Sequence, residues 1–148
     1  MATLTPTLTI ASTDVFASHP INLTVTDSLA VEAPMSDISR MNTDDNIGQT
    51  GGASVIIPES TDVYFVYVKH TGILASDGKT LANVTADYIT LGDVDGTANS
   101  MIRLYPGEFA FFPLNVGDGS GGSGNDGGLK VTAGSAAVQL EFAYLKRS

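Results

Sequence analysis

The segment at residues 93–99 comes nearest to a metal-binding pattern in this sequence. It reads Asp-Val-Asp-Gly-Thr-Ala-Asn, so oxygen-bearing side chains recur at Asp93, Asp95 and Asn99 around a glycine turn. Hard oxygen ligands at such spacing are typical of calcium loops, which also need a third early ligand and a bidentate Glu. Both are missing, so an Asx-Gly hairpin turn is the preferred interpretation. Asp93, Asp95 and Asn99 are kept as metal candidates, but no metal or other cofactor is predicted.

The residues that could support catalysis form no recognisable motif. Neither His19 nor His70 lies at a metal-ligand spacing, and no G-x-S-x-G nucleophile elbow is present. A Ser-His-Asp triad can still form in space, because its members need not be close in sequence. Few Glu and no Trp argue against a sugar-cleaving pair of carboxylates beside stacking aromatics. No catalytic residue is assigned, and the chain is predicted not to be an enzyme.

The charge of the chain restricts its partners. Its formal net charge is −9, with only seven Lys and Arg, whereas nucleic-acid binding depends on cations that neutralise phosphates. Direct DNA or RNA binding is therefore not expected. No apolar run is long enough to cross a membrane, and the first residues lack the pattern of a secretory signal. We therefore expect no membrane contact and synthesis in a cytoplasm.

The composition predicts a single all-β domain over residues 1–148. A chain of 148 residues provides apolar material for about one core. It has 16 Gly, six Pro and no Cys, so packing alone must hold it together. Alternating apolar and polar residues recur, as in Ile21–Thr26 and Val138–Tyr144, while no window shows a helical stripe. About eight to ten short strands without crossover helices favour a two-sheet antiparallel sandwich of jelly-roll type.

Several segments are expected to lie outside the strands. Residues 1–12 are predicted to include an extended arm, in which Pro6 excludes a central strand position. Residues 34–52 lose the alternation and are predicted to form a long loop. The glycine-rich residues 117–128 are predicted to form a flexible loop.

Two apolar stretches are informative about the sheets. In residues 63–68, Val63, Phe65 and Tyr67 point to one face and Tyr64, Val66 and Val68 point to the other. Both faces are therefore apolar, and the strand is either central or exposed at a subunit contact. Tyr105-Pro106-Gly107-Glu108 has the Pro and Gly positions of a type II turn. The aromatic side chains that follow it, Phe109, Phe111 and Phe112, are interpreted as core rather than as a ligand platform.

The order of these elements resembles a class of small structural proteins of tailed phages, especially marine ones. The resemblance is carried by SVIIPESTDVYFVYVKHTG, ITLGDVDGTANSMIRLYPGEFAFFPL and LKVTAGSAAVQLEFAYL. It covers about the C-terminal two-thirds of the chain, and the glycine-rich loop is not part of the pattern. The resemblance implies a jelly-roll subunit on a capsid or tail, often a homotrimer, with no enzymatic role.

The first hypothesis for function is a capsid decoration, or cement, protein on the virion surface. Its expected partners are the major capsid protein and further copies of itself. We expect the contacts to come from residues 2–10 and 34–52, which are polar, extended and unneeded by the core. The interaction candidates within them are Thr3, Leu4, Thr5, Pro6, Asp37, Arg40, Asn42, Asp44 and Asp45.

Two alternatives from other classes remain open at the level of sequence. One is a carbohydrate-binding module of a tail or fibre, with residues 93–99 and 117–128 at its tip. The other is a secreted calcium-dependent adhesion or lectin domain. Copy number per virion separates the first alternative from a decoration protein, and calcium titration tests the second.

Overall fold

The computed structural model describes residues 2–13, 21–32, 38–43, 54–57, 63–93, 100–115 and 128–148. These residues form strands and turns, and all of their strand pairs are antiparallel. The chain divides into two compact units, Met35–Lys146 and Met1–Pro34 with Arg147–Ser148. The strands are β1 (Ala2–Leu4), β2 (Thr7–Ser12), β3 (Ile21–Thr26), β4 (Leu29–Val31), β5 (Ser39–Asn42), β6 (Ser54–Ile57), β7 (Val63–Leu74), β8 (Ile89–Asp93), β9 (Ser100–Leu104), β10 (Phe109–Asn115), β11 (Leu129–Ala133) and β12 (Val138–Lys146).

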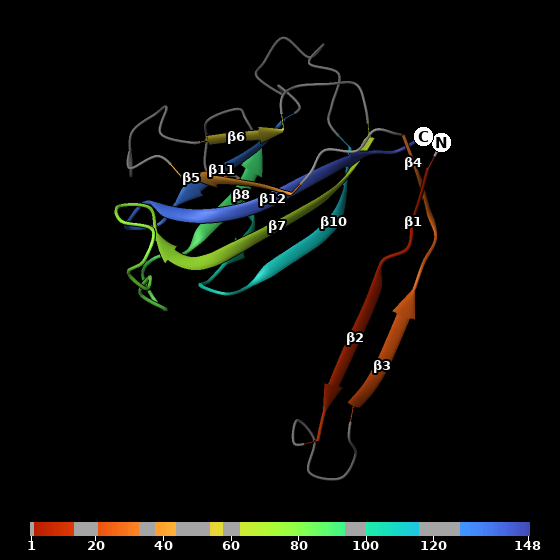
Figure 1. Cartoon of the computed structure of the whole chain (residues 1–148), viewed down its shortest axis with the longest axis horizontal. Coiled ribbons are helices and arrows are strands. Elements are labelled where there is room, and N and C mark those ends of the chain that lie inside the picture. Colours follow the sequence, from red (N-terminus) through yellow and green to blue (C-terminus); the bar gives the residue numbers. More distant parts are fainter. Residues whose placement is uncertain are drawn as a thin grey trace. The chain divides into compact units, whose positions relative to one another are not determined.

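The larger unit is a β-sandwich, as the sequence predicted. One sheet has the strand order β10-β7-β12-β5 and the other has the order β6-β11-β8-β9. Figure 1 shows the two sheets as layers, with β7 and β12 at the centre of the first. Because each sheet has one apolar face to bury, stacking the two faces is the arrangement that removes both from water.

The strands of the sandwich are paired in a nested pattern. β5 pairs with β12, β6 with β11, β7 with β10 and β8 with β9. The first strand of the unit is therefore matched with its last, and each following strand with the next one inward. Two further ladders, β7 with β12 and β8 with β11, join these pairs into the two sheets.

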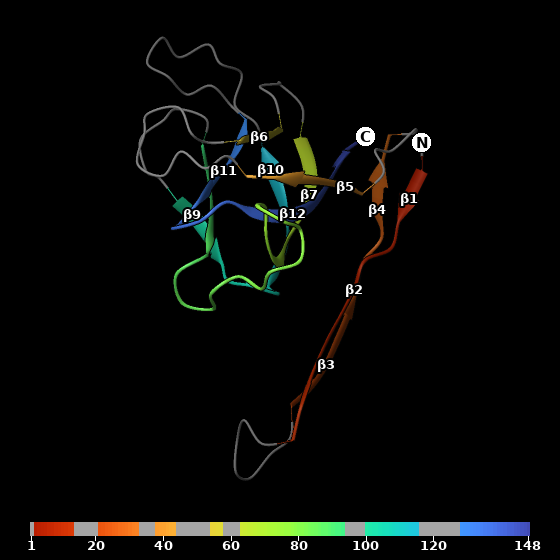
Figure 2. The same ribbon diagram turned by 60° about the vertical axis from the view of Figure 1, so that its left-hand side comes forward.

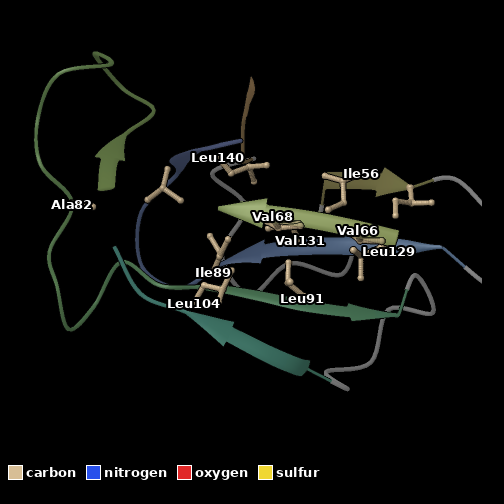
Figure 3. Close-up of a cluster of buried hydrophobic side chains, with 12 residues drawn as sticks. Ile56, Val66, Val68, Ala82, Ile89, Leu91, Leu104, Leu129, Val131 and Leu140 are labelled. Atoms are coloured by element: carbon tan, nitrogen blue, oxygen red, sulfur yellow. The ribbon is translucent and has the colours of Figure 1, made fainter. Parts of the chain in front are cut away.

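The hydrophobic core lies between the two sheets and is built mainly from alternate residues of their strands, while β6 contributes the consecutive Ile56 and Ile57. Val66, Val68 and Leu140 point inward from the first sheet, and Ile89, Leu91 and Val131 do so from the second (Figure 3). All six are at most 1% exposed. Alternation with a period of two, visible in the sequence, is the direct cause of this arrangement.

The corner between β9 and β10 has the predicted turn. Gly107 has a φ of 89°, a value that suits glycine and that a type II turn requires at its third position. The Glu108 amide donates to the Tyr105 carbonyl at 2.9 Å, which closes the turn. The Gly107 amide also donates to the His70 carbonyl at 3.0 Å, so the corner is anchored to β7.

The structure differs from the predicted loop over residues 34–52, because β5 lies inside it. The Ser39–Asn42 stretch has little strand propensity of its own, and its pairing with β12 stabilises it instead. Met41 packs against the core. Thr43 follows β5, and its backbone amide and its hydroxyl group both donate to the Val138 carbonyl. The Thr43 hydroxyl oxygen also accepts a hydrogen bond from the Val138 amide. Residues 34–37 and 44–52 of that loop lie outside the described residues, as do residues 117–127 of the glycine-rich loop.

The smaller unit is a long interrupted hairpin. β1 pairs with β4 and β2 pairs with β3, so the segment predicted to include an extended arm contains two paired strands, joined by Thr5 and Pro6. Pro6 lies between the two ladders, and its carbonyl accepts a hydrogen bond from Asp27 at 3.1 Å. The C-terminal Arg147 bridges to Val31 and thereby extends the β1–β4 part of the hairpin. Figure 2 shows β2 and β3 side by side along its length.

Within the described ranges, no helix has the length and apolar character needed to cross a membrane.

Replacing Leu140 with Ala should destabilise the sandwich by about 2–5 kcal/mol, because Leu140 is fully buried and its loss leaves a cavity. The matched control is Leu81→Ala, since Leu81 is 79% exposed and its truncation should change stability by less than about 0.5 kcal/mol. Urea unfolding measures both. Equal effects at the two positions would contradict the placement of the core.

Candidate interaction surfaces

The outer face of the β10-β7-β12-β5 sheet presents aromatic side chains in register. Residues on this face alternate with the core residues of the same strands. Phe111 on β10 lies opposite Tyr67 on β7, and Pro113 lies opposite Phe65. We refer to Phe65, Tyr67, Phe109 and Phe111 as the aromatic face.

Two members of the aromatic face are largely exposed. Phe109 is 59% exposed and Phe111 is 40% exposed, whereas Phe65 is 7% exposed. The rings contact across the strands, since Phe65 and Phe111 stack at 6.3 Å between centroids and Tyr67 and Phe109 lie at 6.4 Å. The interpretation of the aromatic run as core is therefore wrong for Phe109 and Phe111. Phe112 alone packs against the core, because strand alternation sends its neighbours to the opposite face.

One end of this face is polar. Arg40 on β5 lies opposite Glu141 on β12, which lies opposite Lys69 on β7. The Arg40 guanidinium donates to Glu141 Oε1 from Nε at 2.9 Å and from Nη2 at 2.5 Å. Arg40 is an exposed side chain, so this ion pair contributes about 0–1 kcal/mol. Burial, and then the nearby Glu141 carboxylate, raise the pKa of the Tyr67 hydroxyl above its ordinary 10.0, which keeps this group neutral and able to donate.

A second exposed apolar surface lies on the β2–β3 ladder of the hairpin. Leu8 lies opposite Val25 and Ile10 lies opposite Leu23, so all four side chains point to one side of the ladder. They are between 44% and 50% exposed. We refer to Thr7–Ser12 with Ile21–Thr26 as the ribbon, and to these four side chains as its apolar face.

The described interaction residues belong to both compact units. Thr3 and Leu4 lie on β1, and Thr5 and Pro6 connect it to β2. Arg40 and Asn42 lie on β5. Their partners on β12 are Glu141 and Gln139, which are two positions apart, so both β5 side chains lie on the same side of the sheet as the aromatic face. Asp37, Asp44 and Asp45 lie outside the described residues.

The metal candidates are only partly described. The backbone of Asp93 ends β8, while Asp95 and Asn99 lie outside the described residues. In the part of the chain that the structure describes, no three His, Cys, Asp or Glu side chains are grouped as metal ligands.

A serine, a histidine and an aspartate do come together, but they are not connected as a catalytic triad. Ser135 Oγ donates to Asp87 Oδ1 at 2.6 Å. The other oxygen of the Asp87 carboxylate accepts a hydrogen bond from the backbone amide of Asn83. His70 Nε2 lies 2.7 Å from the Asp87 carbonyl oxygen, not from its carboxylate. In a triad the imidazole would lie between the serine hydroxyl and the carboxylate. This cluster instead holds the 82–88 segment and the turn at Ser135 in place.

His70 is a structural residue at the centre of that cluster. Its side chain is fully buried, and its Nδ1 accepts a hydrogen bond from the Gly72 amide at 3.0 Å. The proton must therefore be on Nε2, which donates to Asp87. Burial is the main influence on His70 and lowers its pKa below the ordinary 6.5, although Asp87 and Glu108 partly oppose the shift.

The exposed position of the aromatic face had a signal in the sequence. The apolar character of both faces of residues 63–68 left a subunit contact open as one of two interpretations. The exposure of the apolar face of the ribbon had no signal in the sequence. Alternation in TLTIAS and INLTVT is the same for a strand that covers a core and for a strand that does not.

No protein-family model matches this chain, and neither a curated protein nor a solved structure matches it.

The lowered pKa of His70 predicts a pH-dependent stability. The unfolded chain takes up a proton on this residue as the pH falls through about 6.5, whereas the buried ring resists protonation. Stability is therefore highest above about pH 6.5 and is lost as the pH falls through the folded pKa. The His70→Gln variant should lose less stability than the wild type between neutral and mildly acidic pH in urea unfolding. Equal losses in the two proteins would show that His70 does not carry this dependence.

Proposed function

We propose that this chain is a non-enzymatic virion structural protein, a capsid decoration protein that binds and stabilises an assembled shell. The observation that carries the proposal is the exposure of Phe109 and Phe111 on the outer face of a sandwich. Exposed aromatic side chains in register on a sheet are a feature of contact surfaces rather than of free surfaces. The net charge of −9 disfavours nonspecific adhesion to other acidic surfaces.

We further infer that the sandwich is a jelly roll, as the resemblance implied. Nested pairing of β5 with β12, β6 with β11, β7 with β10 and β8 with β9 is the pattern of a long hairpin rolled into two sheets. Jelly rolls of eight strands occur in viral capsid and lectin domains. The topology supports a virion role by analogy only, since one fold serves many functions.

The aromatic face is the surface that we assign to the shell. The exposed fractions of Phe109 and Phe111 together amount to about one fully exposed Phe, whose burial contributes about 1.5–3 kcal/mol. Such a contact is modest for one copy. A protein present in many symmetric copies, or as an oligomer with several such faces, converts it into strong binding through effective concentration.

Stabilisation of the shell then follows from mass action. A protein that binds only the assembled lattice lowers the free energy of that state by its binding free energy. No chemistry and no bound cofactor are needed. The polar end of the face, with Arg40 paired to Glu141, would fix the orientation of the contact more than its strength.

The proposal predicts that Phe109→Ser with Phe111→Ser lowers occupancy on capsids that have been prepared without this protein. The affinity should fall by about tenfold or more per contact, the equivalent of the burial energy of one Phe. Quantitative gels of repurified particles measure the copy number, and thermal disassembly of the particles measures the stabilisation. Undiminished occupancy of the double variant would contradict the assignment of this face.

The matched control is Leu81→Ser with Val84→Ser. Both residues lie in the sandwich unit and are 79% and 70% exposed, but neither belongs to the aromatic face. This control should bind like the wild type. If the wild type binds no capsid, the decoration role is wrong, and a handful of copies per virion would instead support a tail or fibre role.

A further inference from the structure

We infer that the ribbon joins this chain to a second copy of itself through its apolar face. The inference rests on the proposed function for its purpose, since a decoration protein with copies of itself as partners needs a surface for them. Its physical basis is independent and lies in the residues of β2 and β3.

The apolar face of the ribbon is regular and exposed. Its two cross-strand pairs, Leu8 with Val25 and Ile10 with Leu23, are consecutive on the same side of the ladder. Each side chain leaves close to half of its surface exposed. Aliphatic pairs of similar size at this spacing can pack against an identical set without large gaps.

The ribbon carries no charge. β2 and β3 contain only Thr, Ser, Asn and aliphatic residues. Two copies of a chain with a net charge of −9 repel each other, and this repulsion is weakest where neither surface has an acidic group. An uncharged surface also offers nothing to select a basic partner. A second copy is therefore the occupant that the charge distribution favours.

The backbone of the ribbon is also incomplete as a sheet. β2 and β3 form a two-stranded ladder, and no third described strand joins them. Two-stranded hairpins are marginally stable in water and gain stability from a further strand or a packed face. Soluble proteins usually protect such edges with Lys, Pro or a bulge. β2 and β3 contain none of these within their bounds, and their register has no shift.

The size of the surface sets the strength of the association. Six residues per strand span about 20 Å, and two strands with their side chains are roughly 10 Å wide. The footprint is then a few hundred Å² at most, against about 800 Å² per partner in a standard interface. Self-association through the ribbon should therefore be reversible and depend on concentration. Closed symmetry is the usual form of such assemblies.

Sedimentation of the purified protein without any capsid tests the inference separately from shell binding. Over a concentration series, the wild type should reach a multiple of its mass of 15.3 kDa. Ile10→Asp with Leu23→Asp should raise the midpoint concentration for association by at least tenfold. Thr9→Asp with Thr24→Asp adds the same charge to the neighbouring cross-strand pair on the opposite face and should have a much smaller effect.

A wild type that remains a single copy at every concentration would overturn the inference. So would equal dissociation of the two double variants, because the effect would then come from charge and not from the apolar face. Neither outcome concerns the binding of the aromatic face to a shell.

A cysteine test leaves the fold of the ribbon nearly unchanged. The chain has no Cys, so Leu23→Cys introduces a single reactive thiol on the apolar face. Mild oxidation should trap a covalent dimer of this variant in high yield. Leu81→Cys, at a position of the sandwich unit that is 79% exposed against 47% for Leu23, should still give little dimer. Equal yields from the two variants would contradict a specific contact at the ribbon.

Discussion

The ladder between β7 and β12 is the interaction on which the rest of the sandwich depends. These two strands are the centre of the first sheet, with β10 and β5 attached to their outer edges. Their inward residues, including Val66, Val68 and Leu140, form one side of the core. Their outward residues include Phe65 and Tyr67, whose rings contact the exposed Phe111 and Phe109. A single pair of strands thus supplies one side of the core and part of the layer on which the exposed aromatic side chains of β10 rest.

Polar groups buried beside this ladder are satisfied inside the chain. His70 continues β7 beyond the apolar core, and its ring joins the Gly72 amide to the Asp87 carbonyl. Asp87 in turn binds the Asn83 amide and the Ser135 hydroxyl. Because each of these groups has a partner inside the chain, the cluster fixes the path of the chain between β7 and β8.

Much of the fold could be predicted from the sequence, since strand alternation and turn chemistry are local signals. The type II turn at Tyr105–Glu108 and the two-sheet sandwich followed from them. β5 could not be predicted, because Ser39–Asn42 has no strand pattern and forms only when β12 offers an edge. The sequence left open whether the outer face of residues 63–68 is covered and assigned Phe109 and Phe111 to the core, because alternation says which residues share a face but not which face is covered.

For the two exposed apolar surfaces we propose one physical account, in which the aromatic face of the sandwich contacts a shell and the apolar face of the ribbon contacts a second copy of the chain. Imaging of intact particles at a resolution that resolves side chains tests this account most directly. The account predicts that Phe109 and Phe111 are covered by a neighbouring subunit of the shell. Particles in which both rings face solvent would contradict it.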